Sequence, residues 1–153
     1  AAPLIIWGGF PGEWEGEHPS EAVKRRGIEG VFFAGWRGHE DLPLALASAD
    51  VFVAPSVDEP FGQVYLEAMA CGLPLISTQS GGLKEVIGDE AIIIEPASVK
   101  SIVEAVIDLF ANKEQQLALS KSGRKRIEDE FNWLKAAKGY EVIYSKAIRE
   151  FGN

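Results

Sequence analysis

The chain has 153 residues, of which 46% are hydrophobic and 25% are charged. This composition fits one globular domain with a core of its own. The net charge of −8 argues against a nucleic-acid partner and against a broad contact with anionic membranes. The single cysteine, Cys71, leaves no intrachain disulfide and favours a reducing compartment, so we expect a cytoplasmic protein.

Short apolar runs alternate with helical patterns along the chain, which predicts a parallel sheet with crossover helices. Strands are expected at Leu4–Trp7, Val31–Ala34, Val51–Ala54, Pro74–Thr78 and Ala91–Glu95. Helices are expected at Glu21–Arg26, His39–Ala49, Gly62–Cys71 and Leu83–Ile87. After a predicted N-cap at Ser98, three further helices are expected at Val99–Ala111, Lys113–Phe131 and Trp133–Phe151. The expected fold class is therefore α/β, with a Rossmann-like parallel sheet of about five strands followed by C-terminal helices.

The stretch from Pro55 to Gly82 concentrates the residues that suit ligand chemistry. Glu59 lies in a loop after a predicted strand, and Glu67 lies inside the next helix. Because Gly62 begins that helix, free backbone N–H groups and the positive end of the helix dipole face the loop. The pattern predicts an anion site with a carboxylate at either end. A nucleotide sugar, with phosphates in its middle and hydroxyls at both ends, suits such a site.

The position of Glu67 and the role of the two glutamates stay open at this point. Glu67 falls at the edge of the apolar stripe of its helix, where it either presents its carboxylate to the crevice at the strand ends or faces solvent. The stripe itself is expected to be core: Leu66, Met69, Ala70 and Leu73. At a rise of ~1.5 Å per residue, Gly62 and Glu67 are already ~7.5 Å apart, and Glu59 lies beyond that end of the helix. The separation of the two carboxylates therefore does not suit the ~5 Å pair of a retaining glycosidase. The wider pair of an inverting glycosidase stays open, but two separate hydrogen-bonding roles suit the spacing better.

The segment DEPFGQVYLEAMACGLPLISTQSGGLKEVI resembles the signature of retaining glycosyltransferases with the GT-B fold, the glycosyl transferases group 1 family. The family's two glutamates separated by seven residues fall on Glu59 and Glu67, with Phe61 and Gly62 in the expected places between them. The flanking PS and AMACGLP match, as does the GG-x-x-E pattern at Gly81, Gly82 and Glu85. The likeness extends to GGFPGE, to VFFAGWRGHEDLPLALASADVFVAPS, and to FNWLKAAKGYEVIY, which resembles the closing helix that crosses back to the partner domain.

The resemblance implies that residues 1–153 are a C-terminal donor-binding domain for a nucleoside-diphosphate sugar such as a UDP-, GDP- or ADP-sugar. The implied enzyme serves carbohydrate biosynthesis, transfers a hexosyl group with retention, and requires no metal or other cofactor. Glu59 is implied as the catalytic residue that contacts sugar hydroxyls, and Glu67 as the acceptor for the ribose hydroxyls. The other implied donor-binding residues are Phe61, Gly62, Gln63, Val64, Arg37, Gly81 and Gly82. A surface cation is the alternative for Arg37, and a tight turn is the alternative for the glycine pair.

Full-length members of this family begin the domain with a further strand and helix, whose arginine and lysine hold the diphosphate. They also carry an acceptor-binding domain before it. We therefore expect this chain to be part of a longer enzyme, inactive by itself, with that N-terminal domain as its partner. Removing the central strand from the family order 3-2-1-4-5-6 and closing the gap predicts the order 2-1-3-4-5; the alternative is that a further segment fills the gap, because exposed strand edges at the centre of a sheet are not tolerated. The alternative function is a non-catalytic module that binds a nucleotide sugar or a carbohydrate.

A few residues outside these motifs carry weaker expectations. The cations within Lys121–Arg126 predict a solvated helix face. Cys71 is expected to be a small core residue rather than a nucleophile. Trp14 and Trp36, both in predicted loops, are candidates to stack on a sugar ring.

Overall fold

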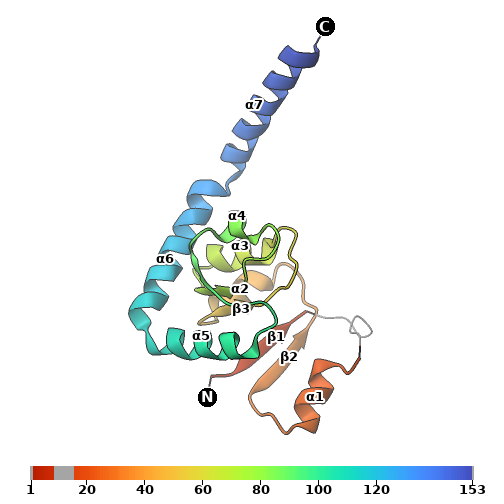
Figure 1. Cartoon of the computed structure of the whole chain (residues 1–153), viewed down its shortest axis with the longest axis vertical. Coiled ribbons are helices and arrows are strands. Elements are labelled where there is room, and N and C mark those ends of the chain that lie inside the picture. Colours follow the sequence, from red (N-terminus) through yellow and green to blue (C-terminus); the bar gives the residue numbers. More distant parts are fainter. Residues whose placement is uncertain (1, 9–15, 153) are drawn as a thin grey trace. The chain divides into compact units, whose positions relative to one another are not determined.

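The computed structural model describes residues 2–8 and 16–152 of the chain. They form two compact units, Ala1–Leu44 and Ala45–Asn153 (Figure 1). All five predicted strands are present and every strand ladder is parallel, which confirms the α/β class. Most of the GGFPGE loop, and Trp14, lie outside the described residues.

The first unit is a strand–helix–strand motif. It contains β1 (Leu4–Trp7), α1 (Pro19–Arg25) and β2 (Val31–Gly35), and β1 pairs with β2 in parallel. The helix begins two residues earlier than predicted because His18 caps it, with Nδ1 accepting the Ser20 N–H at 3.1 Å. Pro19 suits the first helical position, where no N–H is needed. No described side chain of this unit is fully buried.

The second unit holds a three-stranded parallel sheet with β4 in the middle. Its strands are β3 (Phe52–Ala54), β4 (Leu75–Ser77) and β5 (Ala91–Ile93). Leu75 lies opposite Phe52 on one side and Ala91 on the other. Every residue of β4 is buried, as expected for a central parallel strand covered on both faces.

Helices connect these strands in the crossover pattern that the sequence predicts. The helix α2 (Leu42–Ala47) precedes β3 and is shorter than expected, with Pro43 in its first turn. The helix α3 (Gln63–Ala70) joins β3 to β4, and α4 (Leu83–Ile87) joins β4 to β5. The sheet is followed by α5 (Val99–Ala111) and α6 (Lys113–Glu130), and α6 packs against α3.

The predicted strand order is found within each sheet but not as one continuous sheet. The neighbours 2-1 and 3-4-5 are paired as expected, in a two-stranded and a three-stranded sheet. The single order 2-1-3-4-5 is therefore not confirmed. That order depended on closing the gap that the family's central strand occupies, and a ladder between β1 and β3 is not among the pairings of the described residues.

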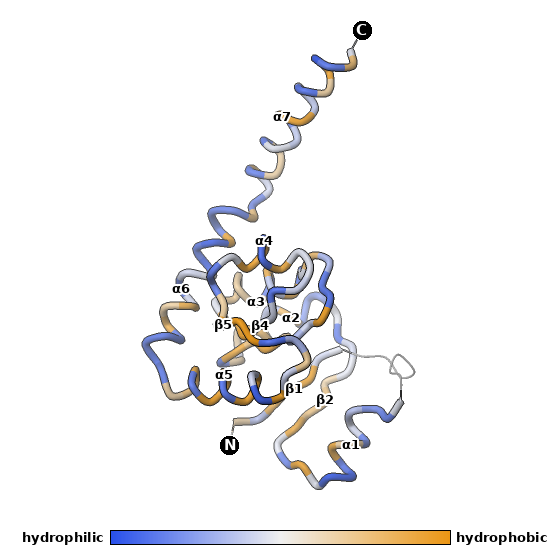
Figure 2. Tube along the Cα trace, viewed as in Figure 1, coloured by the Kyte–Doolittle hydropathy of each residue, from blue (hydrophilic) through white to orange (hydrophobic). Residues whose placement is uncertain are grey.

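The core of the second unit forms between the sheet and its helices. Ile76, Ile94, Ala105 and Leu109 make one buried cluster that joins β4 and the residue directly after β5 to α5. Figure 2 shows the contrast between this core and the outside: β4 and β5 are hydrophobic, whereas most of α6 is hydrophilic. The core thus holds the carboxyl ends of β3 and β4 in fixed positions below the loops that follow them.

The buried face of α3 differs from the predicted stripe. Met69 and Leu73 are buried as expected, but Ala70 is exposed, and Tyr65 and Ala68 are fully buried instead. The phenol ring of Tyr65 explains the shift. It packs edge-on against Phe52 with ring centroids 5.9 Å apart, and this aromatic contact turns its side of the helix toward the sheet.

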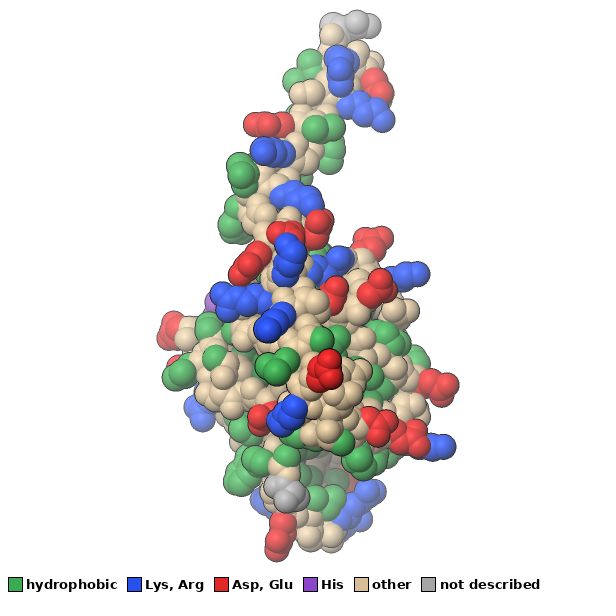
Figure 3. Space-filling model, turned by 90° about the vertical axis from the view of Figure 1, so that its left-hand side faces the viewer, with side chains coloured by type: hydrophobic (Ala, Val, Ile, Leu, Met, Phe, Trp, Pro, Cys, Tyr) green, Lys and Arg blue, Asp and Glu red, His purple; other side chains and the backbone are tan. Residues whose placement is uncertain are grey.

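The last helix, α7 (Trp133–Phe151), carries no buried residue. Asn132 caps it by accepting the N–H of Lys135 at 2.9 Å. One side of α7 bears an exposed apolar stripe: Trp133, Tyr140, Tyr144, Ile148 and Phe151. Figure 3 shows hydrophobic and charged side chains interspersed along this helix. Within the described part of the chain, no helix has the length and apolar character needed to cross a membrane.

Candidate functional site

The loop between β3 and α3 ends at a glycine that no other residue can replace without strain. Gly62, the N-cap of α3, is buried and has a φ of +85°. A Cβ at this position would lie 2.6 Å from Leu83 Cδ2 and 2.8 Å from Tyr65 Cδ2. No side chain caps the helix here. The first turn of α3 therefore keeps the donor character and the positive dipole end that attract an anion.

The glycine pair after β4 packs directly on the backbone of the Glu59 loop. Gly81 has a φ of +58°, and a Cβ on it would lie 2.1 Å from the Glu59 carbonyl oxygen. A Cβ on Gly82 would lie 2.4 Å from the Pro60 carbonyl oxygen, and the Gly82 N–H donates to the Glu59 carbonyl at 3.1 Å. These contacts give the pair a structural role: it lets two loops approach closely and so sets the position of Glu59.

The two glutamates of the predicted site are both half-buried. Glu67 lies one turn along α3 from Gln63, whose Nε2 is 3.4 Å from Glu67 Oε1. The half-shielded position predicted for Glu67 at the edge of the buried face is therefore correct. Phe61 and Val64 are exposed, with 54% and 36% of their surface accessible, so both can meet a ligand.

The structure thus collects most of the predicted site residues into one region of the second unit. The Glu59–Glu67 segment and the glycine pair are joined by the contacts described above. Arg37 lies in the first unit, in the loop after β2, and its side chain is exposed. Trp36 beside it is 62% exposed. Within residues 2–8 and 16–152, no three or more His, Cys, Asp or Glu side chains cluster in a way that could hold a metal ion.

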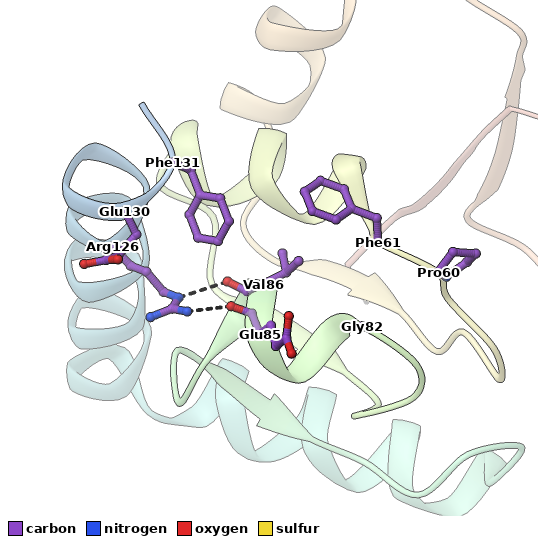
Figure 4. Close-up of a pocket in the computed structure, with 8 residues that line it drawn as sticks. All are labelled: Pro60, Phe61, Gly82, Glu85, Val86, Arg126, Glu130 and Phe131. Atoms are coloured by element: carbon purple, nitrogen blue, oxygen red, sulfur yellow. Dashed lines mark hydrogen bonds between the residues drawn. The ribbon is translucent and has the colours of Figure 1, made fainter. Parts of the chain in front are cut away.

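A pocket of about 310 Å³ lies beside the Glu59 loop (Figure 4). Of the predicted site residues, Phe61 and Gly82 line it, and Glu59 and Glu67 do not. Figure 4 shows the rings of Phe61 and Phe131 on either side of Val86. The complete lining is Pro60, Phe61, Gly82, Glu85, Val86, Arg126, Glu130 and Phe131.

Arg126 on the wall of this pocket caps the end of α4. Its Nε donates to the Val86 carbonyl at 2.9 Å and its Nη2 donates to the Glu85 carbonyl at 2.7 Å (Figure 4). The guanidinium also lies 5.7 Å from the centre of the Phe131 ring. It thereby satisfies last-turn carbonyls that have no partner within the helix. The prediction that the cations of this segment face solvent is therefore wrong for Arg126. It is confirmed for Arg124 and Lys125, which form exposed ion pairs with Glu128 and Asp129.

Comparisons with known proteins agree with this fold and these motifs. A family model described as Glycosyl transferases group 1 matches residues 1–126. The chain is 33% identical over 136 residues to N-acetyl-alpha-D-glucosaminyl L-malate synthase of Bacillus anthracis, which covers 87% of this chain and 35% of that protein.

Solved structures show the same likeness. Sucrose-phosphate synthase of Thermosynechococcus elongatus superposes with a TM-score of 0.83 at 30% identity, covering 96% of this chain and 39% of that one. HepE of Anabaena, solved in complex with UDP, superposes with a TM-score of 0.83 over 95% of this chain and 41% of its own. At 22% identity, the comparison with HepE shows a shared fold alone. This chain therefore spans well under half the length of these relatives. The match over residues 1–126 shows that the chain belongs to the glycosyl transferases group 1 family.

Proposed function

We propose that this chain is the donor-binding domain of a retaining glycosyltransferase that transfers a hexosyl group from a nucleoside-diphosphate sugar. One observation carries the proposal: the first turn of α3, which no side chain caps, stands between two half-buried glutamates, Glu59 and Glu67. The helix start suits the diphosphate, which is the anionic part of such a donor. Membership of the glycosyl transferases group 1 family supports sugar transfer as the reaction class.

Each residue of this segment has a proposed role in holding the donor. Glu59 accepts hydrogen bonds from the sugar hydroxyls beside the reacting carbon, and Glu67 accepts from the ribose hydroxyls. The backbone N–H groups of Phe61, Gly62, Gln63 and Val64 hold the diphosphate and the sugar between them. Negative charge grows on the departing diphosphate in the transition state, so fixed amide dipoles stabilise that state more than the ground state. The proposed reaction requires no metal.

The proposed partner of the chain is the acceptor-binding domain of the same enzyme. The exposed apolar stripe of α7 supports this part of the proposal, since Trp133 and Phe151 at its two ends are 91% and 82% exposed. Large apolar side chains gathered along one helix face are typical of a surface that another domain covers. A cytoplasmic location is proposed with it, supported by the single cysteine of the sequence.

Donor binding can be tested on this chain directly. We expect titration with UDP-glucose, GDP-mannose or ADP-glucose, followed by ¹⁵N NMR, to shift the amide signals of Phe61 through Val64. Glu67→Gln should weaken that binding, because it removes the charged acceptor for the ribose hydroxyls. Glu104→Gln on α5 makes the same chemical change at an exposed position and should leave binding unchanged. Amides that stay unmoved with all three donors would contradict the proposed binding.

Transfer can be tested on the longer protein that contains this chain. Glu59→Gln should lower kcat by about two orders of magnitude if its carboxylate acts in the transition state. NMR of the product should show the same anomeric configuration as the donor. Donor binding without transfer by the wild-type longer protein would favour the non-catalytic module instead, and an inverted product would remove the retaining assignment.

A further inference from the structure

Buried and half-buried hydroxyl groups gather at the carboxyl ends of β3 and β4, where the Glu59 loop begins. The carbonyl oxygen of Ser56 is at the centre of the group. Thr78 Oγ1 donates to it at 2.5 Å and Ser80 Oγ donates to it at 3.0 Å, and these two hydroxyl oxygens lie 3.1 Å apart. Thr78 is fully buried and Ser80 is half-buried. One backbone carbonyl therefore receives two side-chain hydrogen bonds from the next strand's end.

A third hydroxyl holds the same residue from the helix side. The Tyr65 hydroxyl, on the fully buried face of α3, lies 2.8 Å from the Ala54 carbonyl and 3.0 Å from Ser56 Oγ. Both the backbone and the side chain of Ser56 are thus held by neighbouring elements. No buried polar side-chain atom of the described residues lacks a partner, so this polar group is fully satisfied.

These contacts hold the Glu59 loop at two points, one before the glutamate and one at its own carbonyl. Ser56, three residues before Glu59, is held by Thr78 and Ser80. The carbonyl of Glu59 itself is held by the Gly82 N–H at 3.1 Å. The five-residue stretch Thr78–Gly82 therefore anchors the loop at two separated points. Ordering a loop before its ligand arrives removes an entropy cost that binding would otherwise carry.

We propose that Thr78 and Ser80 are positioning residues for Glu59: their hydroxyls hold the Ser56 carbonyl, and so keep Glu59 in place in the loop that leads into α3. One part of this proposal rests on the proposed function, namely that the positioned Glu59 binds a nucleotide-sugar donor. The anchoring of the loop is a property of the free chain.

Amide hydrogen exchange of Gly82 reports on the anchoring without any ligand. Thr78→Val keeps the shape of the side chain and removes its hydroxyl, and Ser80→Ala removes the second one. Each should speed exchange of the Gly82 amide, relative to the amides of β4, by about tenfold, the factor expected from losing one net hydrogen bond. Thr78→Ser, which restores the hydroxyl, should return the exchange to the wild-type rate.

Ser77→Ala is the matched control. Ser77, the last residue of β4, is as buried as Thr78, which follows it, but its hydroxyl donates to the Thr78 carbonyl at 2.9 Å rather than to the Glu59 loop. It should lower global stability without changing the relative exchange of Gly82. If Thr78→Val fails to fold, Ser80→Ala at its half-buried position supplies the same readout. Equal relative exchange in Ser80→Ala and Ser77→Ala would overturn the proposal.

Donor titration then tests the positioning itself. With UDP-glucose, GDP-mannose and ADP-glucose as probes, Thr78→Val and Ser80→Ala should weaken binding by about tenfold and Ser77→Ala should not. Faster Gly82 exchange with unchanged donor affinity would overturn the positioning role. A wild-type chain that binds none of the three donors would contradict the proposed function, and the exchange rates would still decide whether the two hydroxyls anchor the loop.

Discussion

Gly81→Ala tests whether the glycine pair exists to let two loops approach each other. At a φ of +58°, the added methyl group would lie 2.1 Å from the Glu59 carbonyl oxygen and 2.9 Å from its carbonyl carbon. A relaxed contact between carbon and oxygen needs about 3.3 Å, so the Glu59 loop has to retreat by about 1 Å. That movement breaks the hydrogen bond from the Gly82 N–H to Glu59.

Several terms contribute to the expected loss of stability. A left-handed alanine costs about 1–2 kcal/mol, which the reduced freedom of the unfolded chain partly offsets. The steric overlap and the lost hydrogen bond add further destabilisation of about 1–3 and 1 kcal/mol. We expect the free energy of unfolding to fall by about 3 kcal/mol in all. Urea unfolding followed by far-UV circular dichroism measures this loss.

Gly72→Ala separates the steric overlap from the backbone cost. Gly72 lies in the same unit with a φ of +75°, and its nearest neighbour is the Ser120 hydroxyl, 3.3 Å from the added carbon, at the end of a side chain that can rotate. It should lose only about 1 kcal/mol. Equal losses in Gly72→Ala and Gly81→Ala would refute the close-approach explanation, and Gly81 would then be a turn glycine alone.

Three further predictions concern contacts elsewhere in the chain. Arg126→Lys keeps the charge but cannot donate to two carbonyls at once, so it should lower the free energy of unfolding by about 1–2 kcal/mol. Arg124→Lys, at an exposed ion pair, should change that free energy little. Equal effects of the two substitutions would contradict the capping role of Arg126. Ala97 has a φ of +55°, so Ala97→Gly should stabilise the chain by up to about 1 kcal/mol in urea unfolding, and a loss would show that the left-handed backbone carries no strain. Hydrogen bonds from Arg25 lower the pKa of Glu17 below 4.5; their stabilisation is present above that value and lost as the pH falls through the folded pKa. A ¹³C NMR titration should show the lowered midpoint, and Arg25→Gln should return it to the ordinary value; a midpoint that does not move would remove the ion pair's role in solution.

Local patterns in the sequence were sufficient for the elements of the fold. All five strands and the long helices after Ser98 appear within a few residues of their predicted bounds, because apolar runs, helical periodicity and caps act over short distances. The spacing of Glu59 and Glu67 around a glycine at a helix start likewise needed only the sequence. His18 was missed as a cap because histidine is not among the usual capping residues.

Tertiary structure decided the features that depend on distant partners. Sequence alone left Gly81 and Gly82 between a turn and a ligand contact, and only the packed fold places them against the Glu59 loop. The partner of Arg126 lies 40 residues away at Val86, so no local pattern could separate it from its solvated neighbours. The hydroxyl anchor between Ser56 and Thr78 spans 22 residues and exists only because β3 and β4 are adjacent in the sheet. Periodicity describes how one segment buries its own face, whereas the choice of partner belongs to the packing of segments far apart in the chain.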